Sequence, residues 1–119
     1  MTTKLTDPLT FRHGATVHNR IVVPPMLTFS GKENGFASED TLNYYAARSQ
    51  AAGMIIVEYH YVSRSGGPCS PPGYPEQLAI YDDDHFKSIK SIADTLKKDG
   101  NKAILQIHHG GREAVGRAT

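Results

Sequence analysis

The sequence predicts an α/β fold built on a parallel β-sheet, and three observations indicate this. Apolar strand-like runs alternate with helical patterns in the order strand, helix, strand, helix, strand. The strand runs are continuously apolar, which is typical of strands covered on both faces. The connections are long enough for crossover helices, which are right-handed. Two completions are open at this point, a doubly wound open sheet and a (β/α)8 barrel. Three strands are too few for either, since a barrel needs about 250 residues.

The first elements come before the helices. Residues 9–18, "LTFRHGATVH", contain two short strand-like pieces around a glycine and predict a β-hairpin. Residues 20–26, "RIVVPPM", predict the first strand of the sheet. This strand ends at Pro24 and Pro25, because proline has no N–H to donate to a β-ladder.

A first helix is predicted from Ser38 to Gly53. Ser38 is a good N-cap, Glu39 and Asp40 suit the first turn, and Gly53 is a typical C-terminal stop. The expected inner face, at helical spacing, consists of Leu42, Tyr45, Ala46, Ser49 and Ala52. The run Met54–Val62 then predicts the second strand.

A long loop covers residues 63–81, because its glycine, proline and serine content opposes regular structure. A loop of this length in a compact domain is usually functional or disordered. Asp82 or Asp83 caps a second helix that ends at Gly100. Its expected inner face consists of Phe86, Ile89, Ala93 and Leu96. The third strand is predicted over Lys102–Ile107.

Composition excludes several classes of protein. The 119 residues carry 21% charged residues and a formal net charge of +1, so we expect neither nucleic acid nor an anionic membrane as a partner. The single cysteine, Cys69, rules out an internal disulfide. No run approaches the roughly 18 apolar residues of a transmembrane helix, and the N-terminus lacks the apolar region of a secretory signal. We therefore expect a cytoplasmic protein.

Polar residues follow each predicted strand, where active sites lie in parallel α/β folds. The three strand ends are 24–28, 58–60 and 106–112. The sequence contains no GxGxxG, no GxxxxGK[ST], no HExxH and no CxxC. His108 and His109 are adjacent, so on a strand they point to opposite faces and cannot chelate one metal as a simple pair. We expect no metal site.

Each of these polar residues has a structural and a functional interpretation. The Gln106 amide suits the edge of a heterocycle that carries both donors and acceptors, or it satisfies backbone groups inside a barrel. For Glu58, a structural acid is favoured over a catalytic one. Arg112 could bind Glu113 or an anion. Cys69 has no basic neighbour in the sequence closer than Arg64, so a reactive thiolate is not expected.

Four stretches, "NRIVVPPM", "YYAARSQAAGMIIVE", "VSRSGG" and "QIHHGGR", resemble in order and spacing the N-terminal third of the old yellow enzyme family. These are FMN-dependent NAD(P)H oxidoreductases, or ene-reductases, and the closer resemblance is to the bacterial NADH-dependent flavin oxidoreductases. The resemblance implies that residues 1–119 are the N-terminal βαβαβ portion of one FMN-binding (β/α)8 TIM barrel, preceded by a short hairpin. It implies hydride transfer from NAD(P)H to FMN and then to an activated alkene or a related acceptor.

The resemblance also implies site residues. Those placed along the flavin are Pro24, Pro25, Met26, Leu27, Tyr59 and Gln106, and those placed around the substrate pocket are Thr28, Phe29, His109 and Arg112. Three positions depart from the family. Leu27 stands where threonine or cysteine is common, Tyr59 where alanine or glycine is usual, and Phe29 lacks a tyrosine's hydroxyl. The catalytic residues and the phosphate site of the family are expected downstream of Thr119. We therefore expect the isolated chain to be inactive and to bind FMN weakly or not at all.

Two other interpretations remain open. In one, the chain is a non-catalytic half-barrel that pairs its open strand edges with another copy, as a homo-oligomer, or with a partner chain. In the other, the chain is a complete small α/β domain of unrelated function. That interpretation requires the resemblance of all three strand ends to a flavin site to be a coincidence.

Overall fold

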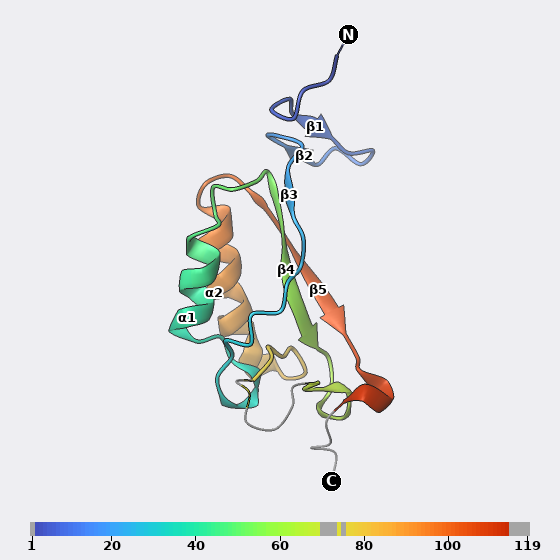
Figure 1. The fold of residues 1–119 in the computed structure, drawn as a ribbon, viewed down its shortest axis with the longest axis vertical. Coiled ribbons are helices and arrows are strands. Elements are labelled where there is room, and N and C mark those ends of the chain that lie inside the picture. Colours follow the sequence, from blue (N-terminus) through green and yellow to red (C-terminus); the bar gives the residue numbers. More distant parts are fainter. Residues whose placement is uncertain (1, 70–73, 75, 115–119) are drawn as a thin grey trace.

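A computed structural model of the chain describes residues 2–69, 74 and 76–114 (Figure 1). Its centre is a three-stranded parallel sheet with the strand order β3-β4-β5. The strands and helices around this centre are β3 (Val22–Val23), α1 (Glu39–Ala46), β4 (Met54–Tyr61), α2 (Phe86–Lys97) and β5 (Lys102–His108). The predicted order of strand, helix, strand, helix, strand is confirmed.

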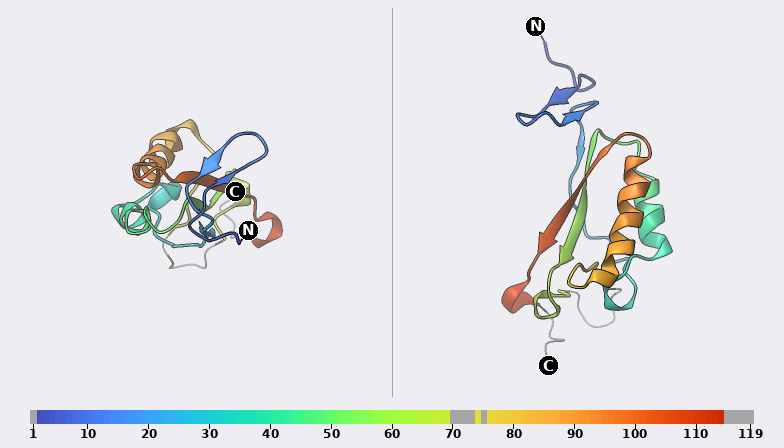
Figure 2. Two further views of the ribbon diagram at one scale, coloured as in Figure 1. Left: turned by 90° about the horizontal axis from the view of Figure 1, so that it is seen from above. Right: turned by 180° about the vertical axis from the view of Figure 1, so that it is seen from behind.

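Both helices pack side by side on one face of the sheet (Figures 1 and 2). A doubly wound sheet has helices on both faces, whereas a barrel has all its helices outside. The buried core lies between this face and the helices and consists of Tyr45, Ala52, Ile55, Val57, Leu78, Ile92 and Leu96. On β5, Ile104 and Gln106 share the other face and are exposed. The arrangement is that of part of a barrel.

A short hairpin precedes the sheet. Its strands β1 (Leu9–Thr10) and β2 (Thr16–Val17) pair antiparallel, and it lies beyond the amino end of the sheet (Figure 1). Strand β3 is shorter than the predicted run 20–26, since only Val22 and Val23 pair with β4 before the two prolines.

Helix α1 begins as predicted but ends earlier. The Ser38 side chain accepts a hydrogen bond from the Thr41 N–H, and the Thr41 side chain accepts one from the Ser38 N–H. The prediction that the helix runs to Gly53, with Ala46 on its inner face, is wrong, because α1 ends at Ala46 and that residue is exposed. The Ser49 hydroxyl instead donates to the Ala46 carbonyl and to Asp99 in a turn that leads into β4.

The start of α2 follows a 3-10 turn, η3 (Asp83–His85), which is capped by the Asp82 side chain. The prediction that Phe86 lies on the inner face is wrong, since Phe86 is 67% exposed. Ile92 and Leu96 are the buried residues of the helix. Phe86 instead is the first residue of α2 and lies beside residues 80–83 of the preceding segment.

The predicted loop 63–81 is described only in part, because residues 70–73 and 75 lie outside the described residues. Its described part contains the 3-10 turn η2 (Arg64–Gly66) and packs onto the sheet. Tyr61 forms an isolated bridge with Ala79, and Leu78 is fully buried. Two further 3-10 turns are η1 (Glu33–Gly35) and η4 (Gly111–Glu113). No helix in the described ranges is long and apolar enough to cross a membrane.

Candidate functional site

The carboxyl ends of the three parallel strands meet at one end of the sheet (Figure 1). The segment after β3, the end of β4 with its loop, and the turn after β5 therefore surround the same region. This is the edge at which parallel α/β folds place their active sites. Each strand end predicted from the sequence contributes to it.

Glu58 joins the first two strand ends. Its buried carboxylate accepts hydrogen bonds from the Thr28 backbone N–H at 3.0 Å, the Thr28 hydroxyl at 2.8 Å and the Tyr45 hydroxyl at 3.0 Å. Burial raises the pKa of Glu58 above its ordinary value, although these hydrogen bonds act in the opposite direction. The contacts are those of a structural acid, which the sequence favoured for this residue.

Hydroxyl groups continue this network towards α1. The Thr28 and Ser30 hydroxyls lie 2.6 Å apart, and those of Ser30 and Thr41 lie 2.7 Å apart. Phe29, between the first two, has a φ of 52°, in the left-handed region that is uncommon for non-glycine residues. Its ring centroid lies 6.0 Å from that of Tyr74. The network fixes the segment after β3 next to the strand ends.

Tyr59 of β4 and His108 of β5 pack against each other near the carboxyl ends of their strands. Their rings stack with centroids 4.0 Å apart, and the Tyr59 phenol interacts with the side chains of Gln77 and Cys69. Burial raises the pKa of Tyr59 above its ordinary value. The bulky Tyr59 that departs from the family pattern is thus packed against His108.

Cys69 has a histidine neighbour in the fold that its place in the sequence does not show. The Cys69 Sγ atom lies 3.7 Å from His108 Nε2, because the loop folds back over the end of β5. The two residues are 39 positions apart in the sequence. Sequence spacing gave no signal for this contact.

Gln106 presents its amide on the face of β5 that points away from the helices. It is exposed and has no hydrogen-bond partner among the described residues. Ile104 lies two residues earlier on the same face, and Met26, after β3, is 60% exposed. A free amide offers two donors and an acceptor, which fits the pyrimidine edge of a flavin. Pro24, Pro25 and Leu27 belong to the same extended segment as Met26.

The turn after β5 holds the remaining predicted residues. His109 Nδ1 accepts a hydrogen bond from the Gly111 N–H at 3.1 Å, and the ring lies against Gly66. The Arg112 side chain is 94% exposed and pairs with Glu113 at 3.1 Å. Of the two partners considered for Arg112, the structure therefore shows Glu113. Within the described ranges, no three His, Cys, Asp or Glu side chains are grouped as metal ligands.

The sequence model that describes the NADH:flavin oxidoreductase / NADH oxidase family matches residues 4–118 of this chain. The chain belongs to this family. The family's name gives NADH and flavin as its reactants, so FMN and NAD(P)H, the cofactors expected from the sequence, are those of the family. The resemblance seen in the sequence is confirmed, and so is the assignment to an oxidoreductase family.

Relatives within the family are longer. The chain is 39% identical over 109 residues to the probable NADH-dependent flavin oxidoreductase YqiG of Bacillus subtilis, covering 92% of this chain and 28% of YqiG. It is 41% identical over 111 residues to the NADH:acrylate oxidoreductase of Vibrio harveyi, covering 93% of this chain and 11% of that protein. The chain thus spans 28% and 11% of the lengths of these two relatives.

Solved structures of the family show the same fold. The old yellow enzyme of Trypanosoma cruzi matches with a TM-score of 0.77 and 29% identity, covering 93% of this chain and 28% of that one. An old yellow enzyme from a Pichia species matches with a TM-score of 0.79 and 26% identity, covering 92% and 27%. The described fold is therefore part of a TIM barrel, as predicted.

Proposed function

We propose that the chain forms the first part of an FMN-dependent NADH oxidoreductase that reduces an activated alkene or a related small molecule. Family membership supports the reaction class, and the relative named for acrylate supports an alkene acceptor. The observation that carries the proposal is the free amide of Gln106, on the sheet face opposite the helices and beside the three strand ends.

Within this proposal, FMN supplies hydride transfer when bound, and the residues of this chain bind and orient it. The Gln106 amide meets the pyrimidine edge of the flavin. Pro24, Pro25, Met26 and Leu27 lie along the ring, and Tyr59 lies near its edge. Glu58 acts as a positioning residue because it holds both the N–H and the hydroxyl of Thr28.

The substrate side of the site comprises Thr28, Phe29, His109 and Arg112. Thr28 and Phe29 follow β3, and the other two lie in the turn after β5, so we place the substrate between these two segments. We place the catalytic residues in the remainder of the barrel, which the longer relatives contain. The single cysteine, Cys69, suits the reducing cytoplasm, where we place the enzyme.

The test is a fusion of this chain to the part of YqiG that follows the matched region. We expect the fusion to bind one FMN per chain, measured by flavin absorbance, and the 119-residue chain alone to bind weakly or not at all. Gln106→Leu should raise the Kd for FMN about tenfold, the effect of losing one or two hydrogen bonds. Gln50→Leu, at an exposed glutamine in the turn after α1, is the matched control. A folded fusion without FMN, or equal affinities for the two variants, would contradict the proposal.

A further inference from the structure

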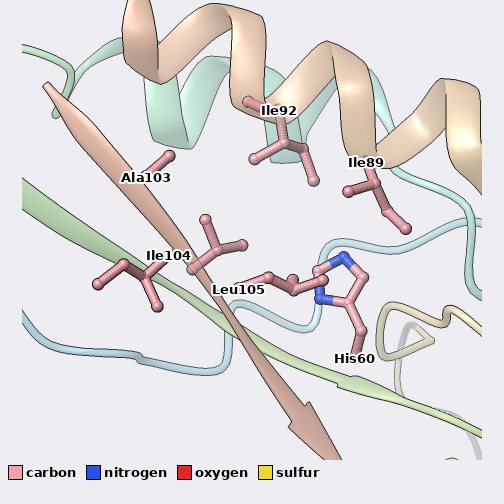
Figure 3. A pocket seen from close by; sticks show the side chains of 8 residues that line it. His60, Ile89, Ile92, Ala103, Ile104 and Leu105 are labelled. Carbon is pink, nitrogen blue, oxygen red and sulfur yellow. The ribbon is translucent and has the colours of Figure 1, made fainter. Parts of the chain in front are cut away.

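A small cavity of about 60 Å³ lies between α2 and the sheet, beside β5 (Figure 3). Its walls are apolar and include Ile89, Ile92, Ala93, Ala103 and Leu105. The exception is His60 of β4, whose ring points towards Leu105 and Ile89. His60 is only 1% exposed, so this imidazole is a buried polar group in apolar surroundings.

The hydrogen bonds of His60 determine what its ring can accept. Nδ1 lies 2.9 Å from the Glu58 carbonyl oxygen, which can only accept a hydrogen bond, so Nδ1 carries the hydrogen. Burial lowers the pKa of His60 to about 4, so the ring is neutral at pH 7. Nε2 is therefore a bare acceptor. It has no hydrogen-bond partner among the described residues.

Cavity size limits what can reach this acceptor. A cavity that binds benzene has a volume of roughly 150 Å³. At about 60 Å³, the cavity beside His60 is too small for an aromatic ring and suits a side chain of a few heavy atoms. A group that fits this volume and also donates to Nε2 is the hydroxyl-bearing side chain of serine or threonine.

The topology identifies the segment that supplies this side chain. Crossovers between parallel strands are right-handed, so the helix that follows β5 in a barrel packs on the same face as α1 and α2, beside α2. Ile89 and Ala93 of α2 line the cavity together with Ala103 and Leu105 of β5, which is the edge strand of the described sheet on that side. The cavity therefore lies next to the place of this helix.

We propose that a serine or threonine of the helix following β5 places its side chain in this cavity and donates its hydroxyl to His60 Nε2. The contact joins the described part of the barrel to the remainder on the outer face of the sheet. This proposal rests on the proposed function only because the helix that follows β5 belongs to the remainder of the barrel. The flavin is proposed for the opposite face, so the two sites are tested separately.

The first experiment probes the cavity in the 119-residue chain with histidines labelled by ¹⁵N. His60→Gln assigns the His60 resonances, and their coupling pattern at pH 7 should show the hydrogen on Nδ1. 2-Propanol and acetone have the same size, but only 2-propanol has a donor. We expect a saturable shift of the Nε2 resonance with 2-propanol and none with acetone. Ala93→Leu, which fills the cavity but keeps His60, should abolish the shift.

Several outcomes would overturn the proposal. These are a hydrogen on Nε2, an equal response to both probes, no response to either, or a response that survives Ala93→Leu. A resonance that changes on dilution of the protein would show that a second copy occupies the cavity, which also overturns it.

The second experiment uses the fusion with YqiG. There the Nε2 resonance should lie at its hydrogen-bonded position without any probe and should no longer respond to 2-propanol. A resonance that still responds would overturn the assignment to the following helix. Flavin absorbance of the same sample reports on the proposed function independently.

Discussion

Glu58 accepts two hydrogen bonds from a single residue, Thr28, one from its backbone N–H at 3.0 Å and one from its hydroxyl at 2.8 Å. The two residues come from neighbouring strand ends, and the carboxylate is buried. A third donor, the Tyr45 hydroxyl, comes from α1. The Glu58 side chain of β4 thus forms hydrogen bonds with both the segment after β3 and helix α1.

We expect Glu58→Gln to destabilise the chain by about 2 kcal/mol, because the amide that replaces one carboxylate oxygen faces buried donors and leaves them unsatisfied. Glu33→Gln, at an exposed acid, should change the free energy of unfolding by less than about 0.5 kcal/mol. Urea denaturation of both variants measures the difference. Equal stabilities would mean that the contacts of Glu58 contribute little to the fold.

The sequence predicted features that depend on neighbouring residues. Ser38 capped α1 as expected, because a cap is decided within one turn. Gly53 was the wrong end for this helix, since α1 ends at Ala46 and the Ser49 hydroxyl in the following turn donates to Asp99, which is 50 positions away. Thr28, which donates to Glu58, lies 30 positions away from it, and His108 lies 39 positions away from Cys69. Hydrophobic periodicity and motifs carry no information about such pairs.

Phe86 shows the same limit for packing. Helical spacing placed it with Ile89, Ala93 and Leu96 on the inner face, but Leu96 is fully buried whereas Phe86 is 67% exposed. The spacing could not show that Phe86, at the first residue of α2, lies beside residues 80–83 and stays exposed there. Which part of an apolar stripe is buried depends on the elements that surround it.

His60 should make stability depend on pH. Burial lowers its pKa from 6.5 to about 4, so the unfolded chain takes up the proton first as the pH falls. Its contribution to stability is complete above pH 6.5 and is lost between pH 6.5 and pH 4, by up to about 3 kcal/mol. Glu58 acts in the opposite sense, because its raised pKa favours the folded state as the pH falls.

The difference between wild type and His60→Gln isolates this effect, since Glu58 is present in both. Between pH 7 and pH 4 the wild type should lose up to about 3 kcal/mol more than the variant, measured by urea denaturation at each pH. His13→Gln, at an exposed histidine, should follow the wild-type curve. Parallel curves for the wild type and His60→Gln would show that His60 titrates alike in the folded and unfolded chain.

Alanine substitutions at Gly35 and Gly100 distinguish the cost of backbone strain from the cost of a steric clash. Their φ angles are 82° and 81°, so alanine is strained equally at both positions. A Cβ at Gly100 meets nothing within 4 Å, whereas a Cβ at Gly35 collides with the side chain of Ala79 and comes within 3.0 Å of the Tyr61 hydroxyl. Gly100→Ala should cost about 1 kcal/mol and Gly35→Ala about 3 kcal/mol. Thermal unfolding measures both, and equal costs would place Ala79 further away than described.

The free edge of β5 provides the test of self-association. Within the described residues, β5 pairs only with β4, and Ile107 near its end is 66% exposed. An unpaired apolar edge favours strand pairing between copies, and a charge at such an edge prevents it. If the half-barrel self-associates through this edge, Ile107→Lys should make the 119-residue chain monomeric. Phe86→Lys, at an equally exposed residue of α2, should leave association unchanged.

Light scattering coupled to size-exclusion chromatography measures the mass over a range of protein concentrations. A monomeric wild type would contradict the interpretation of the chain as a half-barrel that functions by pairing with its own copies. Loss of association in both variants would show that contact occurs through general apolar exposure, because Ile107 and Phe86 lie on different elements. Loss in Ile107→Lys alone would place the interface at the β5 edge. In the fusion with YqiG the same substitution should then impair folding, because the next strand of the barrel has to pair with that edge.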